Sequence, residues 1–121
     1  MSNNALQERN MNNTAVIFQA HQEALEAAAK ATNDFLAKHG DRDMCGFAWV
    51  ESWEKGNTKL GREIATKLGF RKAYGGGYQL WNPSGSYTQA ITAKEEGARA
   101  YVDTMKRHFP NLKMSVGSRL D

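Results

Sequence analysis

Residues 44–53, MCGFAWVESW, are the stretch of sequence on which the fold of this chain depends. Aromatic and β-branched residues are concentrated there, which is typical of a strand. Because successive side chains of a strand point to opposite faces, Phe47 and Trp49 are expected on the same face. The opposite face then carries smaller residues, namely Gly46, Ala48 and Val50. Helices pack closely on small side chains, so we expect the helices on that second face.

Before this strand, residues 13–39 are rich in Ala, Glu, Gln and Lys and are followed by Gly40, which predicts one long helix. Its apolar stripe repeats at intervals of three and four residues, through Ile17, His21, Ala24, Ala28, Ala31 and Phe35. Residues 1–12 are polar and rich in asparagine, and we expect a flexible arm there. The predicted division is therefore an arm (1–12), an N-terminal helix (13–40) and an α+β core (41–121), all within one domain.

After the strand, Asn57 or Thr58 can cap a helix whose apolar positions are Leu60, Ile64 and Leu68. Residues 71–74 and 78–82 are predicted to form a hairpin around three glycines. A capping box in residues 92–95 opens a third helix, with an apolar stripe of Ala98, Tyr101, Val102, Met105 and Phe109. The alternation of Leu112, Met114 and Val116 indicates a last, half-buried strand.

The element order after the first helix is β-α-β-β-α-β, the split pattern of ferredoxin-like folds. We therefore expect an α+β chain with a four-stranded antiparallel sheet. Both later helices should cover one face of that sheet. The open question is what covers the face that carries Phe47 and Trp49.

Composition sets limits on the partners of the chain. Its 121 residues suffice for one domain, and a net charge of +3 permits an anionic partner without demanding one. No apolar run approaches the length of a membrane span, and the polar N-terminus does not resemble a signal peptide. Cys45 is the only cysteine, so no disulfide framework can form. These features predict a protein that acts inside the cell, away from a membrane.

The segment 46–50, GFAWV, resembles the core of the RNP1 motif of RNA-recognition domains, in which aromatic rings on a sheet stack on bases. It departs from that motif because Cys45 stands at the basic position and Ser52 at the closing aromatic position. It also lies on the first strand, whereas RNP1 lies on the third. A second interpretation is that the alanine-rich first helix, or a second copy of the chain, buries Phe47 and Trp49. Of these, we expect the first helix to cover the rings.

Other candidate positions lie elsewhere in the chain. Asn57 and Lys59 lead into a predicted helix N-terminus, which favours an anion, although an ordinary capped turn has the same pattern. Tyr78 and Trp81 flank the glycine hairpin and suit a binding surface or a plain hairpin. Cationic contacts to phosphate are predicted for Arg71 and Arg119.

Catalysis and metal binding receive little support from the sequence. Cys45 could act as a nucleophile only with a nearby base, and no histidine is spaced to supply one. No cluster of Cys and His has metal-ligand spacing. We expect no catalytic residue, no metal and no cofactor.

Five segments of the chain together resemble a family of small proteins encoded by tailed bacteriophages: CGFAWV (45–50), GNTKL (56–60), GGGYQLWN (75–82), KE (94–95) and SRLD (118–121). No activity is assigned to that family, so the resemblance implies only a phage origin and the cytoplasm of an infected host. Together with the residues, it predicts a non-enzymatic accessory protein that binds a nucleotide-like or nucleic-acid ligand, in host takeover or against host defence. The alternative is a protein-binding module, either an inhibitor of a host factor or a virion component. A homo-oligomer through the first helix or the sheet face is also possible in either case.

Overall fold

A computed structural model describes residues 9–121. The predicted arm therefore lies mostly outside the described residues. Residues 9–11 form a helical turn, and Met11 packs against the core. The main elements follow in the order α2 (Thr14–His39), β1 (Gly46–Ser52), α3 (Lys59–Thr66), β2 (Arg71–Lys72), β3 (Tyr78–Trp81), α4 (Ile91–His108) and β4 (Met114–Leu120).

The chain is α+β, with a four-stranded sheet in the order β2-β3-β1-β4 and every neighbouring pair antiparallel. Central strand β1 sets the register of both its neighbours. Trp49 lies opposite Trp81 of β3 and opposite Gly117 of β4, while Phe47 lies opposite Arg119. Residues directly opposite in a sheet share a face, so this register brings distant parts of the chain to one surface.

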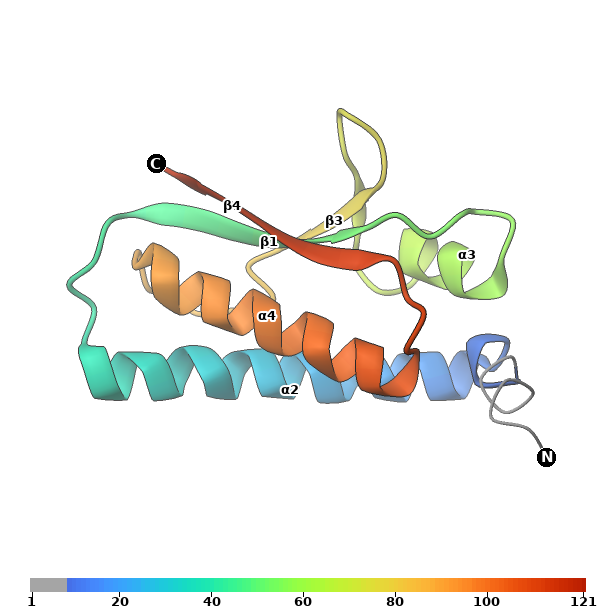
Figure 1. Cartoon of the computed structure of the whole chain (residues 1–121), viewed down its shortest axis with the longest axis horizontal. Coiled ribbons are helices and arrows are strands. Elements are labelled where there is room, and N and C mark those ends of the chain that lie inside the picture. The colour runs from blue at the N-terminus through green and yellow to red at the C-terminus, as the bar shows by residue number, and fades with distance from the viewer. Residues whose placement is uncertain (1–8) are drawn as a thin grey trace.

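The molecule has three layers, with the sheet on one side, α4 in the middle and α2 outside α4 (Figure 1). Helix α4 packs against β1 and β4, and α2 packs against α4. The prediction that the first helix covers Phe47 and Trp49 is therefore wrong. Helix α3 lies at one end of the molecule, where Leu60 and Ile64 join the core.

Small residues at the contact explain why α2 packs against α4. A Cβ atom added to Gly97 of α4 would lie 2.5 Å from Thr32 Oγ1 and 3.2 Å from the carbonyl oxygen of Ala28, both on α2. Three alanines of α2 are completely buried, Ala20, Ala24 and Ala28, whereas Ala31 and Phe35 of the predicted stripe are half-buried. Because the two helices approach so closely, most of the stripe of α2 is buried against α4 rather than against the sheet.

The cap of α3 agrees with the prediction of Asn57 or Thr58, whereas the cap of α4 differs from the prediction. Asn13 and Thr58 accept hydrogen bonds from the first turns of α2 and α3. Helix α4 begins at Ile91, and its N-cap residue Ala90 has no capping side chain. The carboxylate of Asp43 accepts from the Thr92 backbone N–H at 3.0 Å instead. The predicted capping box is therefore wrong, because a residue 49 positions away in the chain supplies the acceptor.

Glu63 is a buried carboxylate that ties α3 to α2, and it should make the fold sensitive to acid. It accepts from Thr14 Oγ1 at 2.7 Å and pairs with the ammonium groups of Lys59 at 2.9 Å and Lys67 at 3.4 Å. The hydrogen bonds from Lys59 and Thr14, with the two positive charges, lower the pKa of Glu63 to about 2.

A folded-state pKa below the ordinary value means that Glu63 stabilises the fold above about pH 4.5 and loses this effect as the pH falls towards 2. We expect Glu63→Gln to reduce stability at pH 7 and to flatten the fall in stability across that window. Urea unfolding at pH 7, 4 and 3 measures both effects. The exposed Glu26→Gln is the control, and an unchanged acid profile in Glu63→Gln would contradict the assignment.

Within residues 9–121, no helix is long and apolar enough to cross a membrane.

Candidate functional site

Three aromatic side chains form a patch on the face of the sheet that points away from the helices. We call Phe47, Trp49 and Trp81 the aromatic patch. The indole rings of Trp49 and Trp81 are stacked, with centroids 4.7 Å apart and planes inclined by 22°. The ring of Phe47 lies 5.9 Å from that of Trp81 at 60°. The patch therefore brings together Phe47 and Trp49, which were predicted on one strand, and Trp81, which was predicted on another.

Hydrogen bonds and a glycine hold both indoles in place. Trp49 Nε1 donates to Glu51 Oε1 at 2.8 Å, and Trp81 Nε1 donates to Gln79 Oε1 at 2.9 Å. Each acceptor lies two residues away on the same strand, so each hydrogen bond restrains the orientation of its indole. Any Cβ at Gly117 would come within 2.4 Å of Trp49 Nε1. Trp49 therefore lies directly on the backbone of β4.

The patch is accessible to a ligand in this structure. Trp81 is 44% exposed, whereas Phe47 and Trp49 are half-buried. Helices α2 and α4 both lie on the other side of the sheet (Figure 1). Trp81 is thus the outermost ring, with Trp49 packed behind it.

Two cations flank the Phe47 end of the patch. The Arg119 guanidinium carbon lies 5.5 Å from the Phe47 ring centroid and 5.9 Å from that of Trp81. The ammonium of Lys94, on α4, lies 5.3 Å from Phe47 and donates to the carbonyl oxygen of Gly46 at 2.9 Å. Among the residues described, no carboxylate forms an ion pair with either cation. This end of the patch therefore carries uncompensated positive charge.

A shallow cavity of about 440 Å³ adjoins Trp81 at the β2 side of the sheet. Arg71 and Gln79 line it and lie opposite each other in the register of β2 and β3. Arg71 is exposed, so a second guanidinium stands beside the patch on the side opposite to Arg119.

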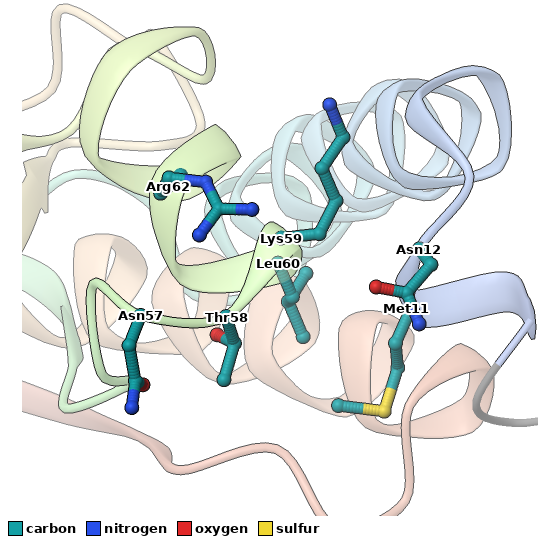
Figure 2. Close-up of a pocket in the computed structure, with 7 residues that line it drawn as sticks. All are labelled: Met11, Asn12, Asn57, Thr58, Lys59, Leu60 and Arg62. Atoms are coloured by element: carbon teal, nitrogen blue, oxygen red, sulfur yellow. The ribbon is translucent and has the colours of Figure 1, made fainter.

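Asn57 and Lys59 lie in a different place, beside a cavity of about 280 Å³ at the start of α3 (Figure 2). Met11 and Asn12 close its other side. Lys59 is paired with Glu63, which compensates part of its charge. Thr58 accepts from the Gly61 N–H, as an ordinary N-cap does. The structure does not bring Asn57 and Lys59 to the aromatic patch.

Tyr78 also lies apart from the aromatic patch. It is opposite Ser52 in the register, on the face that meets the helices, and it packs against the core. Of the predicted ligand-binding residues, the structure thus brings together Phe47, Trp49, Trp81, Arg119 and, at the edge, Arg71.

Cys45 is exposed, and the three histidines contact other residues. Nδ1 of His21 lies 2.6 Å from the hydroxyl oxygen of Tyr101, and Nε2 of His108 lies 2.6 Å from Oε2 of Glu23. The ring of His39 packs on that of Phe35. Residues 9–121 contain no group of three or more potential metal ligands.

Lys94 and Gly117 also belong to this site, although neither was predicted from the sequence. A lysine in the first turns of an amphipathic helix is normally solvated, and nothing local shows that Lys94 reaches a strand 48 residues away. Gly117 had a usable signal, because a glycine inside an alternating strand often marks a close approach by another group.

Fold and site together define an α+β domain with an exposed aromatic and cationic sheet face. Comparison of the chain with protein-family models, curated proteins and solved structures found no match.

Proposed function

We propose that the protein binds a nucleotide-like or single-stranded nucleic-acid ligand on the open face of its sheet, without catalysing a reaction. The observation that carries this proposal is the aromatic patch with Lys94 and Arg119 at one end, where no carboxylate of residues 9–121 forms an ion pair with either cation. A base needs a flat ring on which to stack, and a phosphate needs uncompensated positive charge within reach.

The geometry supports a particular orientation of the ligand. Trp81 offers the most exposed ring and is the position where a base would stack. The phosphate would lie towards Phe47, beside the exposed Arg119, and the ammonium of the buried Lys94 adds positive charge at this end. Glu51 lies at the other end of the patch, on the far side of Trp49 along β1, and it would repel a phosphate there. Base and phosphate are thus directed to different ends.

A protein partner is the alternative, because exposed tryptophan and arginine are also common anchors in protein interfaces. The positive charges of Arg119 and Lys94 beside the rings favour an anionic ligand. A complex with a host protein that survives removal of Trp81 would support the alternative.

Titration with ligands of increasing complexity tests the proposal. Intrinsic tryptophan fluorescence is recorded while a nucleoside, its monophosphate, its triphosphate and a single-stranded homo-oligonucleotide are added. We expect quenching on stacking, tighter binding with phosphate than without, and affinity for the oligonucleotide that falls steeply with salt. Absence of any response across the panel would overturn the proposal.

Arg119 gives a sharper electrostatic prediction. We expect Arg119→Gln to weaken oligonucleotide binding for every sequence and to lower the slope of log affinity against log salt by about one. Fluorescence titrations at four salt concentrations measure the slope. Lys30→Gln on α2 removes the same charge far from the patch and should leave the slope unchanged. An equal effect of both variants would indicate only a general effect of net charge.

We further propose the finer fold class and the biological setting predicted from the sequence. The element order and the strand order β2-β3-β1-β4 support a ferredoxin-like split β-α-β-β-α-β topology. The resemblance to small tailed-phage proteins supports a role inside an infected host, against a host defence or in host takeover.

A further inference from the structure

Strand β4 forms a long free edge of the sheet. It lies at the end of the strand order, and six of its seven residues, Ser115 to Leu120, are exposed or half-exposed. Natural sheets commonly protect such edges with proline, inward-pointing charge, a bulge or a covering element. Strand β4 contains no proline, and it pairs with β1 without interruption from Met114 to Leu120. The opposite edge, β2, has only two residues.

The register shows which backbone groups of β4 remain free. Beyond the two ends of the ladder, Trp53 N–H donates to Lys113 and Asp121 N–H donates to Cys45. Hydrogen-bonded pairs alternate with non-bonded pairs in an antiparallel ladder. The odd-numbered residues of β4 therefore bond to β1, and the outward N–H and C=O groups belong to Met114, Val116, Ser118 and Leu120.

We propose that β4 pairs antiparallel with β4 of a second copy of this chain, centred on Gly117. In this register Met114 meets Leu120 of the second copy, and Val116 meets Ser118. These four positions are the ones whose backbone groups point outwards, so two-fold pairing satisfies all of them. Leu120, which is 54% exposed in one chain, gains an apolar neighbour in Met114.

Charge complementarity favours this register over a shifted one. Lys113 and Asp121 directly precede and follow β4 and are both exposed. With Gly117 at the centre, Lys113 of each copy lies opposite Asp121 of the other, which gives one opposite-charge pair at each end. A shift by two residues would separate both pairs and leave outward backbone groups unpaired.

Pairing would join two aromatic patches into one surface. Trp81, Trp49 and Gly117 lie at one level across β3, β1 and β4. The two-fold axis at Gly117 places the second set in the same row, with the two Trp49 residues three strand spacings, or roughly 14 Å, apart. Only the joining of the two aromatic patches into a binding surface rests on the proposed function. The pairing of the two chains depends only on the free edge of β4.

Sedimentation equilibrium of the full chain without ligand tests the pairing. We expect a concentration-dependent mass that approaches twice the 13.5 kDa of one chain. Ser118→Pro should raise the dimer dissociation constant at least about tenfold, because it removes an outward N–H and places a ring at the edge. Ser118→Ala loses the same hydroxyl contact with Glu95 but keeps the N–H, and should dimerise normally.

A charge exchange provides a test that does not disturb the backbone. Lys113→Asp and Asp121→Lys should each weaken the dimer, and the double variant should restore it. A monomer at all concentrations, or a dimer that Ser118→Pro leaves intact, would overturn the proposal. Because no ligand is present, a failed ligand titration leaves these results unaffected, and a failed dimer test leaves binding to a single patch unaffected.

Discussion

Replacing Trp81 by alanine is expected to weaken the binding of a single-stranded oligonucleotide by about 10- to 100-fold. Trp81 is the outermost ring of the aromatic patch and the one with the largest free surface. Its loss removes the stacking position and also the ring against which Trp49 packs. Fluorescence anisotropy of a labelled oligonucleotide measures the effect without depending on the tryptophans themselves.

Phe18→Ala is the matched control for this experiment. Phe18 is 51% exposed and lies on α2, in the layer farthest from the sheet (Figure 1). Removing it takes away a comparable exposed ring from a different side of the molecule, and binding should not change. Trp81→Phe should retain part of the affinity, because a smaller ring can still stack. Wild-type affinity in Trp81→Ala would place the ligand elsewhere.

Replacing Tyr101 by alanine is expected to destabilise the fold by about 3–5 kcal/mol. Tyr101 has no exposed surface. Its ring lies 6.1 Å from that of Phe70, and its hydroxyl lies 2.6 Å from Nδ1 of His21 on α2. The substitution removes a large core side chain from the contact between the two long helices and leaves His21 without its partner.

Tyr101→Phe separates the hydrogen bond from the packing. This variant keeps the ring and should lower the free energy of unfolding by about 1–3 kcal/mol, because a buried polar atom of His21 is left unpaired. Urea unfolding at pH 7 measures both variants, and Tyr87→Phe, at a fully exposed tyrosine, serves as the control. Equal losses of stability in Tyr101→Phe and Tyr101→Ala would mean that packing of the ring contributes little to stability.

Burial lowers the pKa of His21 below its ordinary value of 6.5. The folded state therefore disfavours a proton on His21, and stability should fall as the pH drops below 6.5. Burial also raises the pKa of Tyr101, so the hydroxyl keeps its proton through this range. The same unfolding measurements at pH 6.5 and 5.5 would show the effect of His21.

Much of the local structure follows from local sequence signals. The β1 strand shows the predicted alternation, with Gly46, Ala48, Val50 and Ser52 buried and the residues between them half-buried. The predicted apolar stripe of the third helix is fully in the core. Caps made by nearby side chains, such as those of Asn13 and Thr58, were also predictable because the two partners are neighbours in the chain.

The candidate site was predictable only in part. Phe47 and Trp49 share a face because of the two-residue repeat of a strand, so their pairing needed no tertiary structure. Their meeting with Trp81 and Arg119 depends on the register of three strands, which local patterns do not specify. Asn57 and Lys59 do not reach the aromatic patch. The ammonium group of Lys59 instead forms an ion pair with the buried Glu63.

By itself, the sequence determined where the helices and strands lie and which face of β1 carries the rings. Those properties arise from hydrogen bonding and side-chain periodicity within a few residues. The tertiary structure alone decided that α2 covers α4, that Lys94 reaches Phe47, and that Trp49 rests on Gly117. Each of these contacts depends on the fit of distant residues, such as Gly97 against Thr32. Close packing selects one partner for each surface, and no periodic pattern encodes that choice.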